Sequence, residues 1–384
     1  MAYRRRIICV AGAFCAFLAV FDHLIPRPLP FLRLGLANMP LMLALFLDLK
    51  SFALLVVVKV LSGALLSGAL FSYLFLFSAA GSAASACVMF ALYRLTGGCG
   101  MSFTGLGVSG ALASNVVQLL LARVFVLGQG AVYIAPPFLA FGVASGFALG
   151  VLCNVFSARS RWYRAALAET ADGAAVCGGV RAAAGERALT GERALAVCER
   201  ALAGERAAVC ERAAAGERAL AGERAAVRAK VLFFAGAAAS VVFSLTPSLP
   251  VKCAEFALIL VVFIAAREKN NFLLTALFVA GIVGAHLVFP HGRVLWQWGG
   301  LRISAGALAE GFDKALSLEG LILISRLCVR KELRFPGLLG SLLCDVFALF
   351  SRLREMRGMV RRGALVESID TMLFDLTRGE AGRC

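Results

Sequence analysis

The stretch Gly107–Arg123, GVSGALASNVVQLLLAR, decides how the fold of this chain is read. Its length and hydrophobicity suit a helix that spans a membrane. It nevertheless carries two amide side chains, Asn115 and Gln118, three residues apart and therefore on one face of a helix. A polar side chain is unfavourable in hydrocarbon unless it has a partner, so we expect this face to point toward other helices or a cavity. Two interpretations stay open: a hydrogen-bond clamp between helices, and contact with a ligand.

The composition of the chain predicts an all-α, polytopic membrane helical bundle. Hydrophobic residues make up 60% of the sequence and charged residues 16%, and the mean hydropathy is +0.85. A soluble globular protein could not bury so much apolar surface. The net charge of +16 would suggest nucleic acid in a soluble chain, but here the arginines flank apolar segments, as the positive-inside rule predicts. We therefore expect the lipid bilayer as a partner and no nucleic acid.

Residues 1–158 form the first predicted domain, a substrate-capture-like bundle of six spans. The six apolar segments are Ile7–Phe21, Leu34–Leu47, Phe52–Leu70, Tyr73–Leu95, Val108–Leu127 and Val132–Phe156. We read the first as a retained helix, because no small-residue cleavage site follows it before Asp22. With six spans, the arginines at 4–6 and at 159–164 fall on one side, which we assign to the cytoplasm. We predict a multi-pass protein of the cell inner (cytoplasmic) membrane with both termini in the cytoplasm.

Lys59 is a cation within the otherwise apolar third segment. Such a cation should be paired or lie near an anionic ligand. Snorkelling toward the cytoplasmic interface is the competing explanation. On the first segment, Gly12 and Ala16 are four residues apart and leave a small-residue groove where another helix can approach closely.

Three stretches of this first region resemble a known family: KVLSGALLSGALFSYLFLFSAAGSAASACVM at Lys59–Met89, RLGLANMP at Arg33–Pro40, and GVSGALASNVVQLLLA at Gly107–Ala122. Together they resemble the Gx transporter family, which is also labelled heptaprenyl diphosphate synthase component I. Members of that family resemble the six-helix substrate-capture subunits of energy-coupling-factor vitamin importers. The resemblance covers about the first 155 residues. One position departs from the pattern, because a histidine commonly precedes the asparagine where this chain has Ser114, so any role of that imidazole is absent or moved.

We select two sets of candidate residues in this domain. The candidates for binding a small-molecule substrate are Asn38, Lys59, Asn115 and Gln118. The candidates for contact with a partner helix are Gly12 and Ala16.

Residues 159–230 form a region of different character, rich in Ala, Glu, Arg and Gly. A Glu-Arg pair recurs every six or seven residues, from Glu186 to Glu223. The recurring glycines weaken a helix, and a six-residue step leaves no consistent apolar or charged face. We predict a partly helical cytoplasmic linker.

Residues 231–384 form the third predicted domain, with three to five membrane or amphipathic helices. Apolar segments resume near Val231–Leu245, Cys253–Ala266 and Phe272–Phe289. The segment Leu301–Leu327 holds too many charges for a lipid-facing span, so it should be amphipathic or shielded by protein. The basic, amphipathic segment Ser351–Gly363 suits an anionic membrane surface or an acidic groove on a partner.

This last domain resembles a shortened transmembrane coupling subunit of the same transporter class. The resemblance rests on the order of the apolar segments, on GLRISAGALAEGFDKAL and on the pair Arg357-Gly358, echoed by Arg362-Gly363. It implies that Arg357, Gly358 and Arg362 engage ATPases. In the family the arginines lie on two separate helices, whereas here the pairs are five residues apart.

The motifs that the sequence lacks exclude several functions. It has no GxxxxGK[ST] motif, so ATP hydrolysis must come from separate ATPase subunits. It has no DDxxD-like cluster for magnesium diphosphate and no CxxC motif among its 12 cysteines. We therefore expect no enzyme, no cofactor and no metal, and we predict an integral membrane transport protein that takes up a small vitamin-like or cofactor-precursor solute. The alternatives are a non-catalytic membrane partner of an isoprenoid or quinone biosynthesis enzyme, and an assembly factor of a membrane complex.

Overall fold

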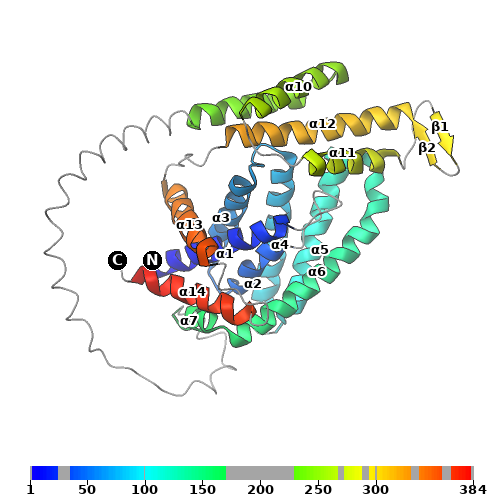
Figure 1. The fold of residues 1–384 in the computed structure, drawn as a ribbon. Helices are drawn as coiled ribbons and strands as arrows, with labels where there is room; N and C mark the ends of the chain where they lie inside the picture. The colour runs from blue at the N-terminus through cyan, green and yellow to red at the C-terminus, as the bar shows by residue number, and fades with distance from the viewer. Residues whose placement is uncertain are drawn as a thin grey trace, which may run out of the picture.

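The computed structural model is almost entirely helical, which confirms the all-α class (Figure 1). It describes residues 2–24, 35–98, 100–169, 229–266, 272–287, 294–298, 301–329, 337–356 and 365–381. Most of the predicted linker, residues 170–228, lies outside these ranges, so its helical content and position stay predictions.

Among the described residues, the first half of the chain supplies four helices that are long and apolar enough to cross a membrane. The elements are α1 (Ala2–Leu24), η1 (Leu36–Asn38), α2 (Met39–Leu43), α3 (Leu49–Ser67), α4 (Tyr73–Leu95), α5 (Phe103–Ala122), η2 (Arg123–Leu127), η3 (Gly128–Gly130), α6 (Ala131–Arg159) and α7 (Arg161–Glu169). The candidate spans are α3, α4, α5 with its continuation to Leu127, and α6. Side-chain N-caps fix where three of them begin, because Asp48, Ser72 and Ser102 accept hydrogen bonds from the first turns of α3, α4 and α5.

The predicted second span, Leu34–Leu47, is wrong as a spanning helix. The described part of this segment forms η1 and the five-residue α2, which are too short to cross a bilayer. All five residues of α2 are buried. The apolar run therefore fills the interior of the bundle instead of crossing the membrane. Helix α3 begins directly after it, behind the N-cap at Asp48.

Helix α1 lies at the centre of the molecule. Every residue from 7 to 17 is buried, as expected for a helix that is apolar on all sides. A Cβ atom on Gly12 would lie 3.0 Å from Val58 of α3 and 3.1 Å from Val346 of the C-terminal helix α13 (Gly337–Glu355). The small residue thus lets two helices approach α1, one from each half of the chain.

Glycines also set the packing of α5 against α6, the most extensive helix pair in the structure. Gly142, Gly146 and Gly150 are spaced four apart on α6 and face α5. A Cβ atom on Gly146 would lie 2.6 Å from the carbonyl oxygen of Gly107, and one on Gly150 would lie 2.4 Å from the Cα of Thr104. Only glycine permits this backbone contact, which is the small-residue packing typical of membrane helices.

The second half begins with a layer of helices that runs across the ends of α4 and α5 (Figure 1). Its elements are the helix Ala229–Leu245, α10 (Leu249–Ala265), α11 (Phe272–Leu287), the antiparallel strands β1 (Val294–Trp298) and β2 (Leu301–Ser304), and α12 (Ala305–Cys328). The three predicted apolar segments are confirmed as helices. Helix α12 packs against both α10 and α11, and its residues 315–325 are buried. Of the charged residues in this segment, Glu319 is buried, whereas Glu310 is exposed and Asp313 and Lys314 are partly exposed.

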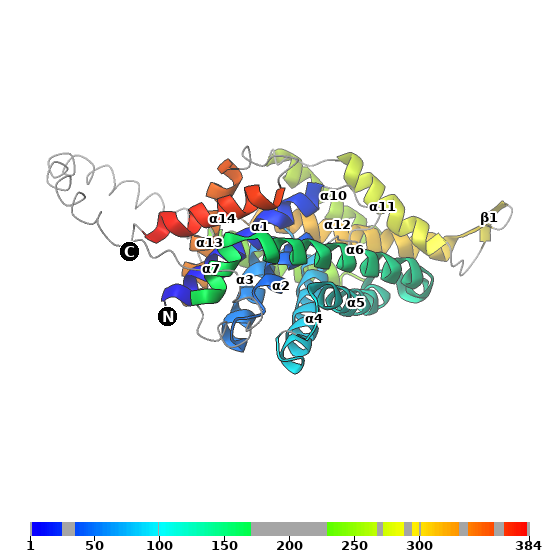
Figure 2. The same ribbon diagram turned by 90° about the horizontal axis from the view of Figure 1, so that it is seen from below.

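The last two helices return to the first half of the chain. Helix α13 packs along α1, where Arg5 donates hydrogen bonds to Asp345 at 2.8 Å and Ser341 at 3.2 Å. The bond to Asp345 raises the pKa of the Arg5 guanidinium above its ordinary value. Helix α14 (Leu365–Ala381) packs on α7 (Figure 2). Its Asp370 carboxylate accepts hydrogen bonds from the backbone N–H groups of Arg161 and Trp162, both at 3.0 Å, and from the Ser160 hydroxyl.

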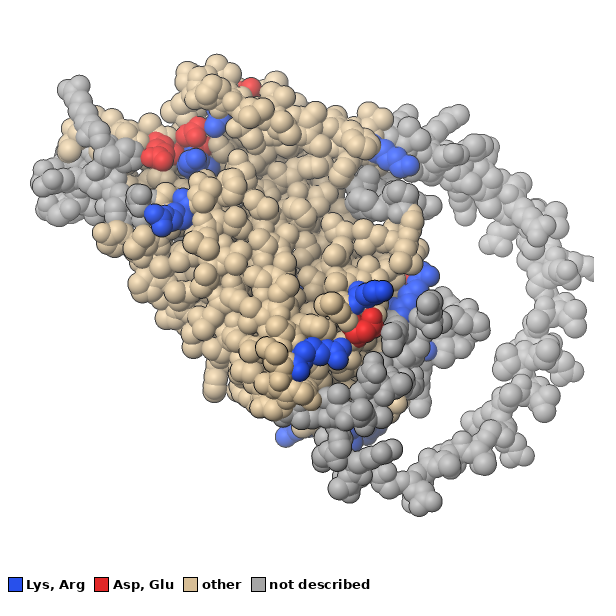
Figure 3. Space-filling view, turned by 180° about the vertical axis from the view of Figure 1, so that it is seen from behind, with Lys and Arg blue, Asp and Glu red and all other residues tan. Residues whose placement is uncertain are grey.

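The surface supports a position in the membrane. Figure 3 shows a broad face without Lys, Arg, Asp or Glu, with charged side chains gathered toward its two ends. Large apolar side chains are exposed along the candidate spans, for example Leu120 at 58% and Phe147 at 57% exposure. Water would penalise such a surface and lipid would not. The chain is a membrane protein.

Candidate functional site

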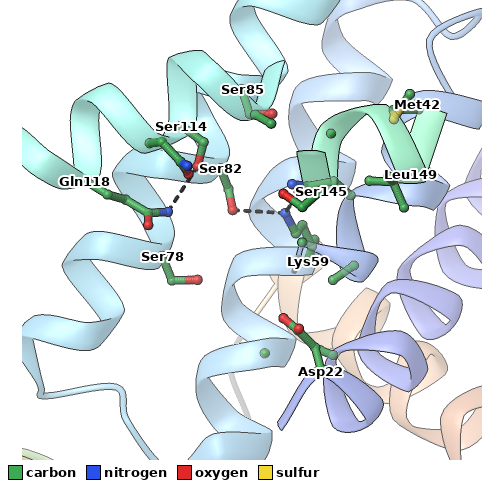
Figure 4. Close-up of a pocket in the computed structure, with 18 of the residues that line it drawn as sticks. Asp22, Met42, Lys59, Ser78, Ser82, Ser85, Ser114, Gln118, Ser145 and Leu149 are labelled. Atoms are coloured by element: carbon green, nitrogen blue, oxygen red, sulfur yellow. Dashed lines mark hydrogen bonds between the residues drawn. The ribbon is translucent and has the colours of Figure 1, made fainter. Parts of the chain in front are cut away.

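A polar cavity lies between α1, η1 and helices α3 to α6 (Figure 4). Its volume, measured as the space that the centre of a water molecule can reach, is about 100 Å³. This is room for several water molecules or one compact solute. The four predicted substrate-binding residues, Asn38, Lys59, Asn115 and Gln118, all line it.

Lys59 of α3 points into this cavity. Its Nζ donates a hydrogen bond to Ser82 Oγ of α4 at 2.9 Å and another to Asn38 Oδ1 at the end of η1. The ammonium therefore binds polar groups inside the protein, which contradicts the snorkelling interpretation. Asn38 and Lys59 were selected separately from the sequence, and the structure brings them into direct contact.

A carboxylate that the sequence analysis did not select lines the same cavity. Asp22, near the end of α1, is only 5% exposed. Figure 4 shows its carboxyl group on the side of the cavity where Lys59 lies. The sequence signal was present, because Asp22 follows directly on an apolar run of spanning length.

Three serines of α4 form a polar stripe on the cavity wall. Ser78, Ser82 and Ser85 follow one another at spacings of four and three residues, so they lie on one helix face. The Ser85 side chain is buried, and its Oγ has no hydrogen-bond partner among the residues that the structure describes. A buried hydroxyl without a partner is unusual and calls for a ligand or water.

The two amides of α5 differ in their contacts: one forms a hydrogen-bond clamp between helices, and the other faces the cavity, where a ligand could contact it. Asn115 Nδ2 donates to the carbonyl oxygen of Phe138 on α6 at 3.0 Å, which is an interhelical clamp. Gly142 makes room for it, because a Cβ there would lie 2.1 Å from Asn115 Nδ2. Gln118 Nε2 instead donates to Ser114 Oγ, one turn earlier on its own helix, at 3.0 Å. Gln118 and Ser114 therefore present polar groups to the cavity without clamping two helices.

The predicted interaction residues have different positions. Gly12 contacts α3 and α13 within the chain, and Ala16 is buried in α1 at 1% exposure. Arg357, Gly358 and Arg362 lie outside the described residues, just beyond the end of α13 at Glu355. Among the described residues, no three His, Cys, Asp or Glu side chains are grouped closely enough to hold a metal ion.

Comparison with known families supports part of the resemblance. Residues 12–156 match the family model for heptaprenyl diphosphate synthase component I. Residues 228–331 match a domain of unknown function, DUF8519. No curated protein and no solved structure matches the chain significantly. All the residues that line the cavity lie within the first matched region, so this membrane protein carries its candidate site in the part that is similar to heptaprenyl diphosphate synthase component I.

Proposed function

We propose that the chain is an integral membrane transport protein whose first half captures a small solute in the cavity around Lys59. The ammonium of Lys59 inside an apolar bundle is the observation that carries this proposal. An ionisable side chain among membrane helices is costly to bury and commonly marks a substrate or ion pathway. The neighbouring serines and amides offer the hydrogen bonds that fix the orientation of a bound solute.

The transport class follows from the resemblance to energy-coupling-factor importers. In that arrangement the first half captures a vitamin-like or cofactor-precursor solute, and the second half couples capture to ATPase subunits that are separate proteins. The flanking arginines support an inner-membrane location with both termini in the cytoplasm.

Retained solutes test the capture step. We would purify the chain in mild detergent, extract its bound small molecules and identify them by mass spectrometry. A solute enriched with the unaltered protein should be lost from Lys59→Met and reduced in Ser82→Ala, because both changes remove polar groups from the cavity wall. Lys50→Met is the matched control, since Lys50 is exposed in the first turn of α3, away from the cavity wall, and should leave retention unchanged. If no solute is enriched, or if Lys59→Met retains it fully, the capture proposal is wrong.

Co-purification tests the coupling step. Replacing Arg357 and Arg362 with lysine keeps the charge but removes the planar guanidinium fork, which docking into an acidic groove requires. Binding to an anionic membrane surface needs only the charge. An ATPase that co-purifies with the unaltered chain should therefore be lost from the double variant. If none co-purifies with the unaltered chain, the coupling part of the proposal fails.

The name of the matched family supports a second candidate function. Heptaprenyl diphosphate synthase component I is named as part of an isoprenoid enzyme, so the chain is alternatively a non-catalytic membrane partner of such an enzyme, or an assembly factor. This alternative predicts co-purification of a prenyl synthase, or of the other members of a membrane complex, with no enriched solute. Analysis of the bound solutes and of the co-purified proteins therefore distinguishes the two candidate functions.

A further inference from the structure

We infer that the cavity recognises a carboxylate of the solute through three serine hydroxyls, those of Ser82, Ser85 and Ser114. This inference rests on the proposed function and names the chemical group by which the same cavity holds its solute.

The Ser85 side chain gives the first observation. It lines the cavity and is 1% exposed, and its Oγ has no hydrogen-bond partner within the described part of the chain. Ser145, on the same cavity wall, donates instead to the carbonyl oxygen of Gly142 on its own helix at 3.2 Å. The Ser85 hydroxyl makes no such bond, so its proton is available for an acceptor in the cavity.

Two buried serines beside it also have a proton to donate. Ser82 Oγ accepts from the Lys59 ammonium at 2.9 Å, and Ser114 Oγ accepts from Gln118 Nε2 at 3.0 Å. Neither nitrogen can accept a hydrogen bond, so each serine must direct its own O–H elsewhere. Within the ranges that the structure describes, neither hydroxyl makes a second hydrogen bond. Both protons are therefore available to a solute.

The three hydroxyls belong to one part of the cavity wall. Ser82 and Ser85 are three residues apart and lie on one face of α4. A Cβ atom on Gly81 would lie 2.8 Å from Ser114 Oγ, so Ser114 lies opposite the same turn of α4. Figure 4 shows all three serines on the side of the cavity that α4 and α5 form.

A carboxylate fits this set of donors best. A carbonyl oxygen has two lone pairs, whereas a carboxylate has two oxygens with about four lone-pair sites and no proton of its own. The Lys59 ammonium also polarises the hydroxyl of Ser82, which makes that hydroxyl a stronger donor. Figure 4 shows Asp22 at the opposite end of the cavity from Ser85, so the Asp22 carboxylate and that of the solute would be kept apart.

Acids and their isosteric amides test this assignment. Equilibrium dialysis with the purified full chain would measure binding of acetate against acetamide, and of propionate against propionamide. Each amide replaces one acceptor oxygen with an NH2 group, which can only donate and would meet a serine proton. Each acid should therefore bind at least about tenfold more tightly than its amide, because the amide loses a hydrogen bond to a charged group.

A pair of serine variants separates recognition from folding. Ser85→Ala removes no hydrogen bond within the described part of the chain, so it should not lower thermal stability. It should nevertheless weaken binding of both acids by about tenfold. Ser109→Ala is the matched control and should leave their binding unchanged, because the Ser109 hydroxyl donates to Leu106 on its own helix at 3.0 Å and does not line the cavity.

The inference is wrong if neither acid binds more tightly than its amide, or if Ser85→Ala binds the acids as Ser109→Ala does. Water would then be the partner of Ser85. A solute that the retained-solute experiment enriches should itself carry a carboxylate, and one without a carboxylate would overturn the inference while capture stands. If that experiment enriches no solute, capture itself is wrong, so the two failures are distinguishable.

Discussion

Asp370 should hold α14 against the rest of the molecule, so replacing Asp370 should make α14 open more often. The Asp370 carboxylate accepts hydrogen bonds from two backbone N–H groups at the start of α7, those of Arg161 and Trp162, and from the Ser160 hydroxyl. Asp370→Ala removes all three. Ser160 Oγ still accepts from the Tyr163 N–H at 3.0 Å, so α7 keeps a cap of its own.

The expected cost follows from the burial of these groups. Trp162 is 6% exposed, so its bond to a charged acceptor contributes about 1.5–3 kcal/mol. The half-exposed bond from Arg161 adds about 0.5–1 kcal/mol, near the lower range for a helix cap. The free energy of opening α14 should therefore fall by about 2–4 kcal/mol, which corresponds to a roughly 30- to 700-fold rise in the open population.

Amide hydrogen exchange followed by mass spectrometry measures this population directly. Peptides from α14 and from the start of α7 should exchange faster by that factor in Asp370→Ala. Asp375→Ala is the matched control, because Asp375 lies on the same helix and is exposed. Equal exchange in the two variants would refute the assignment of Asp370 as the attachment.

Three further predictions address packing, the amides and topology. Gly146→Ala should lower thermal stability in detergent by about 1–3 kcal/mol, because the added methyl group would overlap the carbonyl oxygen of Gly107. Gly284→Ala is the control and should not lower it, because nothing lies within 4 Å of the added methyl group. Equal melting temperatures of the two variants would contradict the glycine contact. Asn115→Leu should cost about 0.6–2 kcal/mol through loss of the α5–α6 clamp, measured by thermal denaturation, while Gln118→Leu should reduce solute retention without that loss; the reverse pattern would exchange their roles. In a variant that keeps only Cys198 and Cys210, both thiols should resist an impermeant thiol reagent in intact cells and react after lysis, and labelling before lysis would reverse the predicted topology.

Hydrophobic pattern was sufficient to locate most helices and the side of α5 that faces the interior. Gln118 is buried on that side and Asn115 is partly buried, so both expected amides face the interior. The pattern failed at Leu34–Leu47, because a run of apolar residues has the same composition whether it faces lipid or fills a protein core. Length alone does not separate these cases when the run is shorter than a full span.

Other features needed the fold before they could be seen. The contact between Gly12 and Val346 joins residues more than 300 positions apart, and no local pattern indicates such a pair. Asp22 was overlooked because it ends an apolar run, where a charge is ordinarily solvated. The GxxxGxxxG pattern at Gly142, Gly146 and Gly150 was readable in the sequence and predicts close helix packing, although it does not name the partner helix.

The crossing of the two helix layers has a consequence for how the molecule sits in lipid. Helix α10 exposes large apolar side chains, including Leu258 at 66% and Val261 at 63% exposure, yet it runs across α4 rather than along it (Figure 1). The hydrocarbon core of a bilayer is about 30 Å thick, and two sets of helices that cross each other cannot both run parallel to the membrane normal. When one set of helices spans the membrane, the other must lie parallel to the membrane plane. The direction in which the capture cavity faces relative to the membrane therefore depends on which of the two helix layers spans the bilayer.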